Sequence, residues 1–146
     1  MQRFMNRVVI VTGAGSGIGE ATARRFSEEG ACVVLAGQTA EKLEKLAATL
    51  PAGRTRVQVT DVADFGECQR LVNAATAAFG KLDVLVSNAG VATQGSVLDG
   101  SLADWKKTMD TNVGGVFNCA RAALPELIQT RGNIVNTASV SGLGGD

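Results

Sequence analysis

A run of aliphatic residues near the start of the chain leads directly into a glycine-rich turn. Val8-Val9-Ile10-Val11 is apolar at every position, as a central parallel strand must be when helices cover both faces of its sheet. The turn Thr12-Gly13-Ala14-Gly15-Ser16-Gly17-Ile18-Gly19 follows, and a helix-forming stretch begins after it. Free backbone N–H groups and the positive end of the helix dipole attract anions at such a junction. The sequence therefore predicts a phosphate-binding turn between the first strand and the first helix.

The spacing of the glycines departs from the general dinucleotide fingerprint. That fingerprint is G-x-G-x-x-G, whereas Gly13, Gly17 and Gly19 give G-x-x-x-G-x-G, with Gly15 as an additional glycine. A glycine cluster is compatible with any sharp turn from a strand into a helix, so a turn without a ligand is the alternative. Its place at the first strand–helix junction favours nucleotide binding.

Composition fits one soluble α/β domain and excludes several other classes of protein. The chain has 146 residues, 45% of them hydrophobic, and no apolar run reaches the ~18 residues of a membrane helix. Its 14 basic and 14 acidic residues cancel, which argues against nucleic acid or an anionic membrane as a partner. The scattered Cys32, Cys68 and Cys119 predict reduced thiols in a cytoplasmic protein. Because the chain has no histidine, neither a metal site nor a histidine base is expected.

Strand and helix patterns alternate along the chain. Strands are expected at residues 8–11, 32–36, 56–61, 82–86 and 134–138. Helix N-termini are indicated by Thr39, by Asp64 with Glu67, and by Ser101 with Asp104. The longest helical region reaches about Arg131, and Pro125 inside it predicts a kink. We therefore expect one domain over residues 1–146, an α/β fold with a doubly wound parallel sheet of Rossmann type that stops after its fifth strand.

Ligands of such sheets bind beyond the carboxyl ends of the strands, and small or polar residues occupy those ends here. They are the glycine turn, Gly37-Gln38, Asp61-Val62, Asn88-Ala89-Gly90 and Ser139. This pattern leaves room for a flat, extended ligand, and the Asp61 carboxylate suits an exocyclic amine. No acid follows the second strand, about 20 residues after the glycines, where one would bind a ribose 2′-hydroxyl. Ordinary loop formation at these ends is the alternative.

These motifs, in this order, resemble the short-chain dehydrogenase/reductase family over the whole of residues 1–146. The resemblance rests on Thr12 to Gly19, Asp61-Val62, Asn88 to Gly90, Asn112 in the long helix, and Ser139. The closing stretch, Ile134 to Asp146, is similar to that of bacterial butanediol dehydrogenases and acetoin reductases. The resemblance implies an oxidoreductase that transfers a hydride between NAD(P) and a secondary alcohol or its ketone, and that assembles as a homotetramer.

The resemblance also assigns cofactor-binding roles. Gly13, Gly17 and Gly19 would form the turn under the cofactor pyrophosphate. The backbones of Ser16 and Ile18 would approach the cofactor. Asp61 and Val62 would line the adenine pocket, and the stretch Asn88 to Gly90 would support the strand beside the ribose.

Two further residues are implied to take part in catalysis. Ser139 would donate a hydrogen bond to the substrate oxygen as that oxygen gains negative charge, and Asn112 would hold a proton-relay water. For Asn112 the alternative is a core amide that satisfies an unwound turn near Gly114-Gly115. For Ser139 it is a small residue that merely ends a strand.

The chain lacks the family's catalytic pair, a Tyr-x-x-x-Lys motif that follows the serine. It contains no tyrosine, and the reaction needs the proton donor that the tyrosine supplies. We therefore expect residues 1–146 to be inactive alone and to be a fragment of a longer enzyme. The alternative is a dinucleotide-binding module or regulatory remnant without turnover. The sequence does not indicate which alcohol is the substrate.

The residues after the second strand bear on the choice between NAD and NADP. Gly37 offers no carboxylate to repel a 2′-phosphate, and the Gln38 amide can donate to one. Thr39 adds a hydroxyl and a helix N-terminus. Ser16, by contrast, stands where a basic residue often accompanies NADP in the family. We expect NADP or dual use, and an ordinary turn without selectivity is the alternative for Gly37-Gln38.

Overall fold

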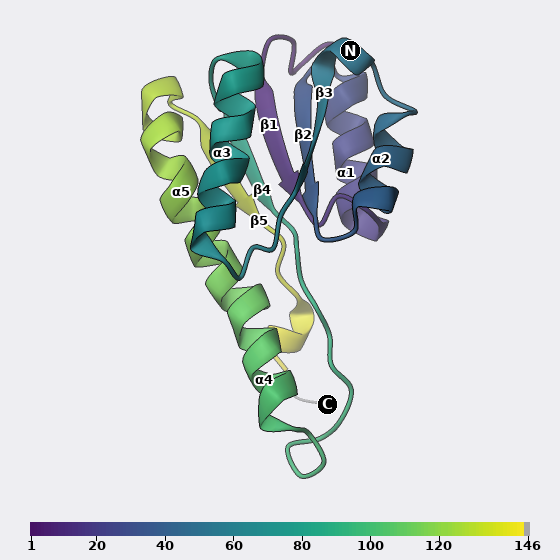
Figure 1. Cartoon of the computed structure of the whole chain (residues 1–146), viewed down its shortest axis with the longest axis vertical. Helices are drawn as coiled ribbons and strands as arrows, with labels where there is room; N and C mark the ends of the chain where they lie inside the picture. Colours follow the sequence, from purple (N-terminus) through teal and green to yellow (C-terminus); the bar gives the residue numbers. More distant parts are fainter. Residues whose placement is uncertain (145–146) are drawn as a thin grey trace.

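The structure is a computed structural model that describes residues 1–144, and it consists of one parallel sheet flanked by helices (Figure 1). The strands are β1 (Val8–Thr12), β2 (Cys32–Gly37), β3 (Thr55–Val59), β4 (Val84–Ser87) and β5 (Asn133–Asn136). The α-helices are α1 (Gly17–Glu28), α2 (Ala40–Ala47), α3 (Phe65–Phe79), α4 (Leu102–Met109) and α5 (Gly115–Thr130). The described residues also include three short helical segments, η1 (Ala52–Arg54), η2 (Asp110–Gly114) and η3 (Val140–Gly142).

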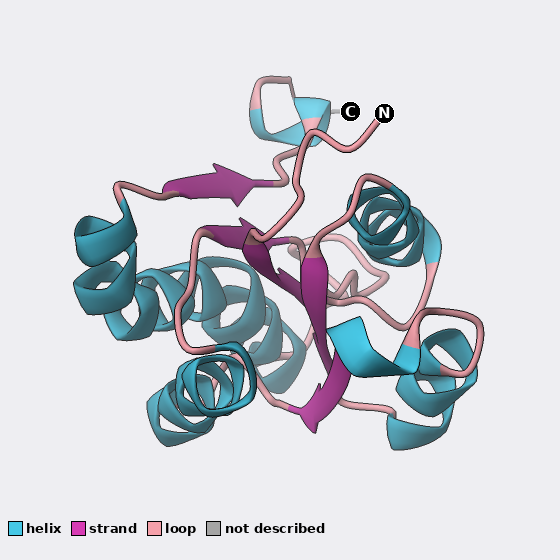
Figure 2. Cartoon of the chain, turned by 90° about the horizontal axis from the view of Figure 1, so that it is seen from above, coloured by secondary structure: helices cyan, strands magenta, loops and turns pink. Residues whose placement is uncertain are grey.

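The sheet has the strand order β3-β2-β1-β4-β5, with every neighbouring pair parallel. Seen from above, helices lie on both faces of the sheet (Figure 2). Alternate residues of β1 explain this arrangement, because Val9 and Val11 pack toward α1 and α2, whereas Val8 and Ile10 pack toward α3 and α5. The predicted doubly wound α/β sheet of Rossmann type is confirmed.

Three strands are shifted by up to two residues at one or both ends, and the fourth covers Val84–Ser87 where 82–86 was predicted. The third strand covers Thr55–Val59 where 56–61 was predicted, and the fifth covers Asn133–Asn136 where 134–138 was predicted. The third strand ends early because the Asp61 backbone N–H donates to the Glu67 carboxylate, 2.5 Å away, instead of to a neighbouring strand. The third and fifth strands therefore end two residues earlier than the sequence indicated, and Asp61 and Ser139 lie in the loops that follow them.

The long helical region changes its hydrogen-bonding pattern in η2, a feature that the sequence did not predict. The α5 helix runs from Gly115 to Thr130 through Pro125, and the change in helical hydrogen bonding occurs earlier, in the π-helical segment η2. Such π-turns are frequent at functional sites. A Cβ on Gly115 would lie 2.5 Å from Cγ2 of Val62, so this glycine lets α5 approach the segment after β3. Within the described residues, no helix has the length and hydropathy needed to cross a membrane.

Candidate functional site

A cleft of about 370 Å³ opens beyond the carboxyl ends of the strands. Its walls come from the β1–α1 turn, the β2–α2 loop and the first residues of α2, the segments after β3 and β4, and η2. The lining residues are Gly13, Gly15, Ser16, Gly37, Gln38, Thr39, Lys42, Leu43, Thr60, Val62, Ala89, Gly90, Val91 and Thr111. Segments distant in sequence thus meet at one edge of the sheet, where open α/β sheets bind ligands.

The glycine turn is built so that no side chain fills the space between β1 and α1. Gly13 has a φ of +63°, and a Cβ there would lie 2.9 Å from Cα of Ala89. Gly19 is buried at the start of α1, where a Cβ would overlap the Gly13 carbonyl oxygen and lie 2.6 Å from Nδ2 of Asn88. Gly17 has a φ of +55° but faces open space. The turn backbone at Gly13 therefore packs directly against the backbone of Ala89 and of Gly19. The first N–H groups of α1, which have no partner within the helix, have no side chain of these glycines in front of them.

Thr12 fastens the end of β1 to the segment that follows β4. Its buried hydroxyl accepts from the backbone N–H groups of Asn88 and Ala89, both at 3.0 Å, and donates to the Val86 carbonyl at 3.4 Å. The Asn88 amide oxygen accepts in turn from the Thr137 hydroxyl at 3.0 Å. The segment Asn88 to Gly90 is thereby held between the first and the fifth strands, beside the cleft.

Val62 and Asp61 follow the third strand but take different places. The Val62 side chain is 4% exposed and lines the cleft. Asp61 lines an adjoining hollow of about 400 Å³ together with Gln38. Its Oδ1 accepts from the backbone N–H of Ala63 at 3.0 Å, so part of its hydrogen-bonding capacity holds the turn. The structure thus places Val62, and not Asp61, in the wall of the main cleft.

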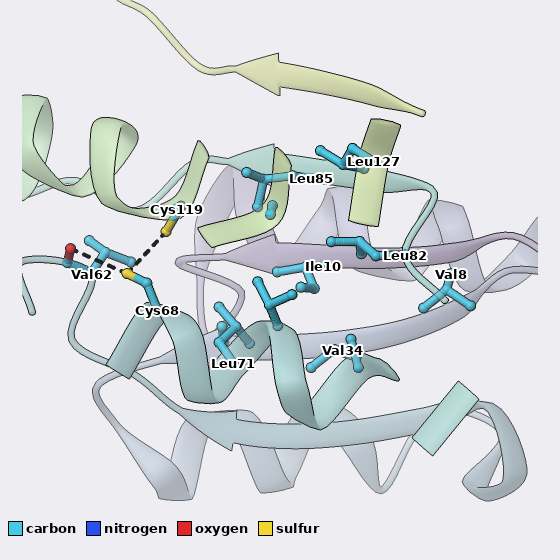
Figure 3. Packing of buried hydrophobic residues seen from close by; sticks show 14 residues of the cluster. Val8, Ile10, Val34, Val62, Cys68, Leu71, Leu82, Leu85, Cys119 and Leu127 are labelled. Carbon is cyan, nitrogen blue, oxygen red and sulfur yellow. Dashed lines mark hydrogen bonds between the residues drawn. The ribbon is translucent and has the colours of Figure 1, made fainter. Parts of the chain in front are cut away.

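A pair of buried thiols lies beside Val62 (Figure 3). Cys68 of α3 and Cys119 of α5 have their sulfur atoms 3.5 Å apart, and Cys68 also contacts the Val62 carbonyl oxygen at 3.5 Å. The hydrogen bond to Cys68, together with burial, raises the pKa of Cys119 well above its usual range. The Val62 carbonyl oxygen also accepts from Nδ2 of Asn118 at 2.9 Å. The two helices therefore fix the segment that carries Val62.

Asn112 lies in the π-helical segment η2 and binds the chain beyond β4. Its Oδ1 accepts from the backbone N–H of Val91, and its Nδ2 donates to the carbonyl oxygen of the same residue, both at 2.8 Å. The amide therefore does not satisfy the turn near Gly114-Gly115, which was the alternative for this residue. It joins η2 to the segment after Gly90, in the wall of the cleft.

Ser139 lies beyond the end of β5 and outside the lining of the cleft. It is exposed, and its hydroxyl accepts from the backbone N–H of Ser141 at 3.2 Å at the start of η3. In the part of the chain that the structure describes, no hydrogen bond joins Ser139 to Asn112. The two residues expected to act in catalysis thus lie on separate segments, one in η2 and one beyond β5, and no hydrogen bond in the described residues joins them.

Most of the predicted cofactor-binding residues line the cleft, together with several residues that were not predicted. Gly13, Ser16, Gly37, Gln38, Val62, Ala89 and Gly90 line it, whereas Gly17, Ile18, Gly19, Asp61 and Asn88 do not. Ile18 is 67% exposed to solvent. Sequence reasoning missed Gly15, Lys42, Leu43, Thr60, Val91 and Thr111 as lining residues. For Lys42 a signal was present, because a residue in the first helical turn after a strand-end loop faces the same edge of the sheet.

Comparison with known proteins places this architecture among dehydrogenases. A family model described as short chain dehydrogenase matches residues 7–145. The meso-2,3-butanediol dehydrogenase of Serratia marcescens is 51% identical over 144 residues, which cover 99% of this chain and 57% of that protein. An uncharacterized oxidoreductase of Staphylococcus aureus is 41% identical over 143 residues, or 97% of this chain and 62% of that protein. The chain therefore spans about three fifths of the length of these relatives.

Solved structures agree with the sequence relatives. A short-chain dehydrogenase/reductase from Brucella melitensis, described as a glucose/ribitol dehydrogenase, superposes with a TM-score of 0.94 at 35% identity, covering 98% of this chain and 60% of that one. A short-chain dehydrogenase/reductase of unknown function from Caenorhabditis elegans, crystallised with cofactor, gives a TM-score of 0.90 at 32% identity, covering 99% and 56%. The resemblance found in the motifs extends to the whole described backbone.

Proposed function

Because the chain belongs to the short-chain dehydrogenase family, we propose that it is the dinucleotide-binding part of an oxidoreductase. The reaction is hydride transfer between NAD(P) and a secondary alcohol or its ketone. The observation that carries this proposal is the cleft of about 370 Å³ over the glycine turn, at the carboxyl ends of the strands. The name of the Serratia marcescens relative makes a 2,3-diol the first substrate to test.

The residues of the cleft fit a dinucleotide. Gly13 and Ser16 hold the pyrophosphate beside the first N–H groups of α1, where the absence of side chains lets the backbone approach an anion. Val62 would pack against the adenine, and the pair Ala89-Gly90, which lines the same cleft, would lie beside the ribose. When bound, the nicotinamide supplies or accepts the hydride. The loop residues 37–39 favour NADP or dual use, since no carboxylate among the described lining residues repels a 2′-phosphate.

Ser139 and Asn112 take the remaining roles that we propose. Ser139 donates a hydrogen bond to the substrate oxygen, which stabilises the negative charge that develops there. Asn112 holds η2 against Val91 through its two 2.8 Å hydrogen bonds, and this arrangement keeps the backbone of the π-turn available for a proton-relay water. The 146 residues contain no tyrosine, so the catalytic reading requires a proton donor from outside them. The alternative function is a dinucleotide-binding module without turnover.

Turnover tests this proposal. The 146-residue chain should bind NADPH but show no measurable ketone reduction. A chimera in which the remaining C-terminal part of the Serratia marcescens relative follows Asp146 should oxidise meso-2,3-butanediol with matching nicotinamide reduction. Steady turnover by the 146-residue chain would show that its own residues supply the proton donor. A folded chimera that binds the dinucleotide but never turns over would favour the module.

We also propose that the protein is cytoplasmic and assembles as a homo-oligomer, a tetramer by analogy with the family. Its three cysteines are free, which suits a reducing compartment. Several large apolar side chains of α5 face solvent, including Phe117 at 62%, Leu124 at 44% and Ile128 at 72% exposure. An apolar face of this kind marks an interaction surface. Sedimentation velocity should give a species larger than the monomer, and Ile128→Glu should shift it toward the monomer; a monomeric parent would contradict this assembly.

A further inference from the structure

Two of the three cysteines meet in the core between α3 and α5 (Figure 3). Cys68 is fully buried, Cys119 is 2% exposed, and their sulfur atoms lie 3.5 Å apart. The two residues are 51 positions apart in the sequence, so the packing of the helices brings them together. The sulfur atoms of a disulfide are about 2.04 Å apart. The two thiols are therefore in contact without a bond, and a closure of roughly 1.5 Å would join them.

The two thiols differ in acidity. A hydrogen bond from Cys119 lowers the pKa of Cys68, and this effect exceeds the opposite effects of burial and of the nearby Asp64 carboxylate. Cys68 also lies in the first turn of α3, where the positive end of the helix dipole favours a thiolate. The same hydrogen bond, together with burial, raises the pKa of Cys119. Cys68 is therefore the nucleophile of the pair, and Cys119 retains its proton.

Val62 links the thiol pair to the cleft. Its side chain lines the cleft and also belongs to the apolar cluster that contains both cysteines. Its carbonyl oxygen lies 3.5 Å from the Cys68 sulfur. A molecule of about the size of water in the cleft therefore needs only a local opening at Val62 to approach Cys68. Hydrogen peroxide is such a molecule.

We propose that Cys68 and Cys119 form a redox site, which hydrogen peroxide converts into a disulfide between α3 and α5. The Cys68 thiolate attacks one peroxide oxygen, the O–O bond breaks, and hydroxide leaves and is protonated to water. Cys68 is then a sulfenic acid. The Cys119 sulfur attacks the Cys68 sulfur, the S–O bond breaks, and a second water leaves with the Cys119 proton. In total the two thiols give up two electrons and two protons, and one peroxide becomes two waters.

Cys32 is placed differently and serves as the internal reference. It lies in β2, and within the described residues no sulfur contact joins it to another cysteine. The pair, by contrast, would close a loop of 51 positions between two helices that pack on each other. A cross-link of this kind restricts the unfolded chain and stabilises the folded one. Cytoplasmic disulfides are usually transient and redox-sensing, so a small dithiol should return the pair to its reduced state by exchange.

Peroxide treatment of the purified protein, followed by thiol counting and peptide mapping, tests this site. We expect two of the three thiols to be lost together, with Cys68 and Cys119 recovered as one cross-linked peptide pair and no oxygen added to either cysteine. Dithiothreitol should restore both thiols. The oxidised protein should melt about 5–10 °C above the reduced one, because the disulfide constrains the unfolded chain.

Cys32→Ser is the matched control, and it should keep both the cross-link and the rise in melting temperature. Cys68→Ser should abolish the cross-link and leave Cys119 a free thiol. Cys119→Ser should leave Cys68 as a sulfenic acid that dimedone traps, because the thiol that would resolve it is gone. The peptide map of the parent decides the question even where a variant fails to fold. A folded parent whose Cys68 and Cys119 stay reduced, cross-link only between molecules or only acquire oxygen would overturn the proposal.

Discussion

Replacing Gly19 by alanine should lower the melting temperature of the protein by about 3–9 °C and weaken NADPH binding by about a hundredfold. The added methyl group would overlap the Gly13 carbonyl oxygen and lie 2.6 Å from Nδ2 of Asn88. Both neighbours are fixed, one in the turn and the other beside Thr12, so α1 must move. Overpacking of this kind lowers the free energy of unfolding by about 1–3 kcal/mol. In a domain of this size, each kcal/mol lowers the melting temperature by roughly 3 °C. The first N–H groups of α1 are the ones that we propose bind the pyrophosphate, so a shift of this helix would remove hydrogen bonds to it. The loss of about two such bonds accounts for the lower affinity.

Gly53→Ala is the matched control for this substitution. A Cβ at Gly53 meets no heavy atom within 4 Å, and the residue lies in η1, away from the cleft. Gly17→Ala separates strain from crowding, because that glycine has a φ of +55° but faces open space; its cost should be about 1–2 kcal/mol. Thermal melts and fluorescence titrations give both quantities. A Gly19→Ala protein with parental melting temperature and affinity would mean that the turn is not packed as described.

Replacing Ser139 by alanine should lower kcat of the catalytically complete polypeptide by roughly 10²–10³-fold with little change in dinucleotide affinity. This is the scale of losing one hydrogen-bond donor to a developing oxyanion. Without substrate, the Ser139 hydroxyl accepts from the backbone N–H of Ser141 at 3.2 Å. That bond orients the oxygen while its proton stays available to a substrate. The active chimera described above is suited to the measurement.

Ser141→Ala is the matched control, because it keeps the backbone N–H that Ser139 uses and removes only the neighbouring hydroxyl. Its kcat should stay within about twofold of the parent value, the range of a neutral surface change. Steady-state kinetics with saturating NADPH and a separate titration of the dinucleotide distinguish chemistry from binding. A Ser139→Ala enzyme with parental kcat would remove this residue from the catalytic set.

The sequence predicted the features that depend on local patterns. The apolar run at Val8 to Val11 identified a strand covered on both faces, and glycine spacing located the turn. Asp64 and Ser101 do cap their helices, accepting from Glu67 N–H at 2.9 Å and Asp104 N–H at 3.0 Å. Thr39 occupies the capping position of α2 but makes no such side-chain bond. A threonine at this position can adopt side-chain rotamers that do not reach the helix N–H groups, and the sequence pattern does not indicate which rotamer it takes.

Features that depend on long-range contacts were not predictable in this way. Pro125 indicated a kink, yet the helical pattern changes at η2, where Asn112 binds Val91 and Gly115 contacts Val62. Asp61 lies with Gln38 in the hollow that adjoins the cleft, and its backbone N–H bonds to Glu67 of α3. In each case a partner from another element determines where the residue lies.

An NMR titration of the folded 146-residue protein with NADPH tests the central claim most directly, because it locates the ligand without any need for turnover. We expect saturable binding and shifts of the backbone amides of Gly13, Ser16, Gly37 and Gly90, which line the cleft. The amide of Ile128, on the exposed face of α5, should remain unchanged. A dispersed spectrum that NADPH does not perturb, or shifts confined to α5, would contradict a dinucleotide site at the carboxyl ends of these strands.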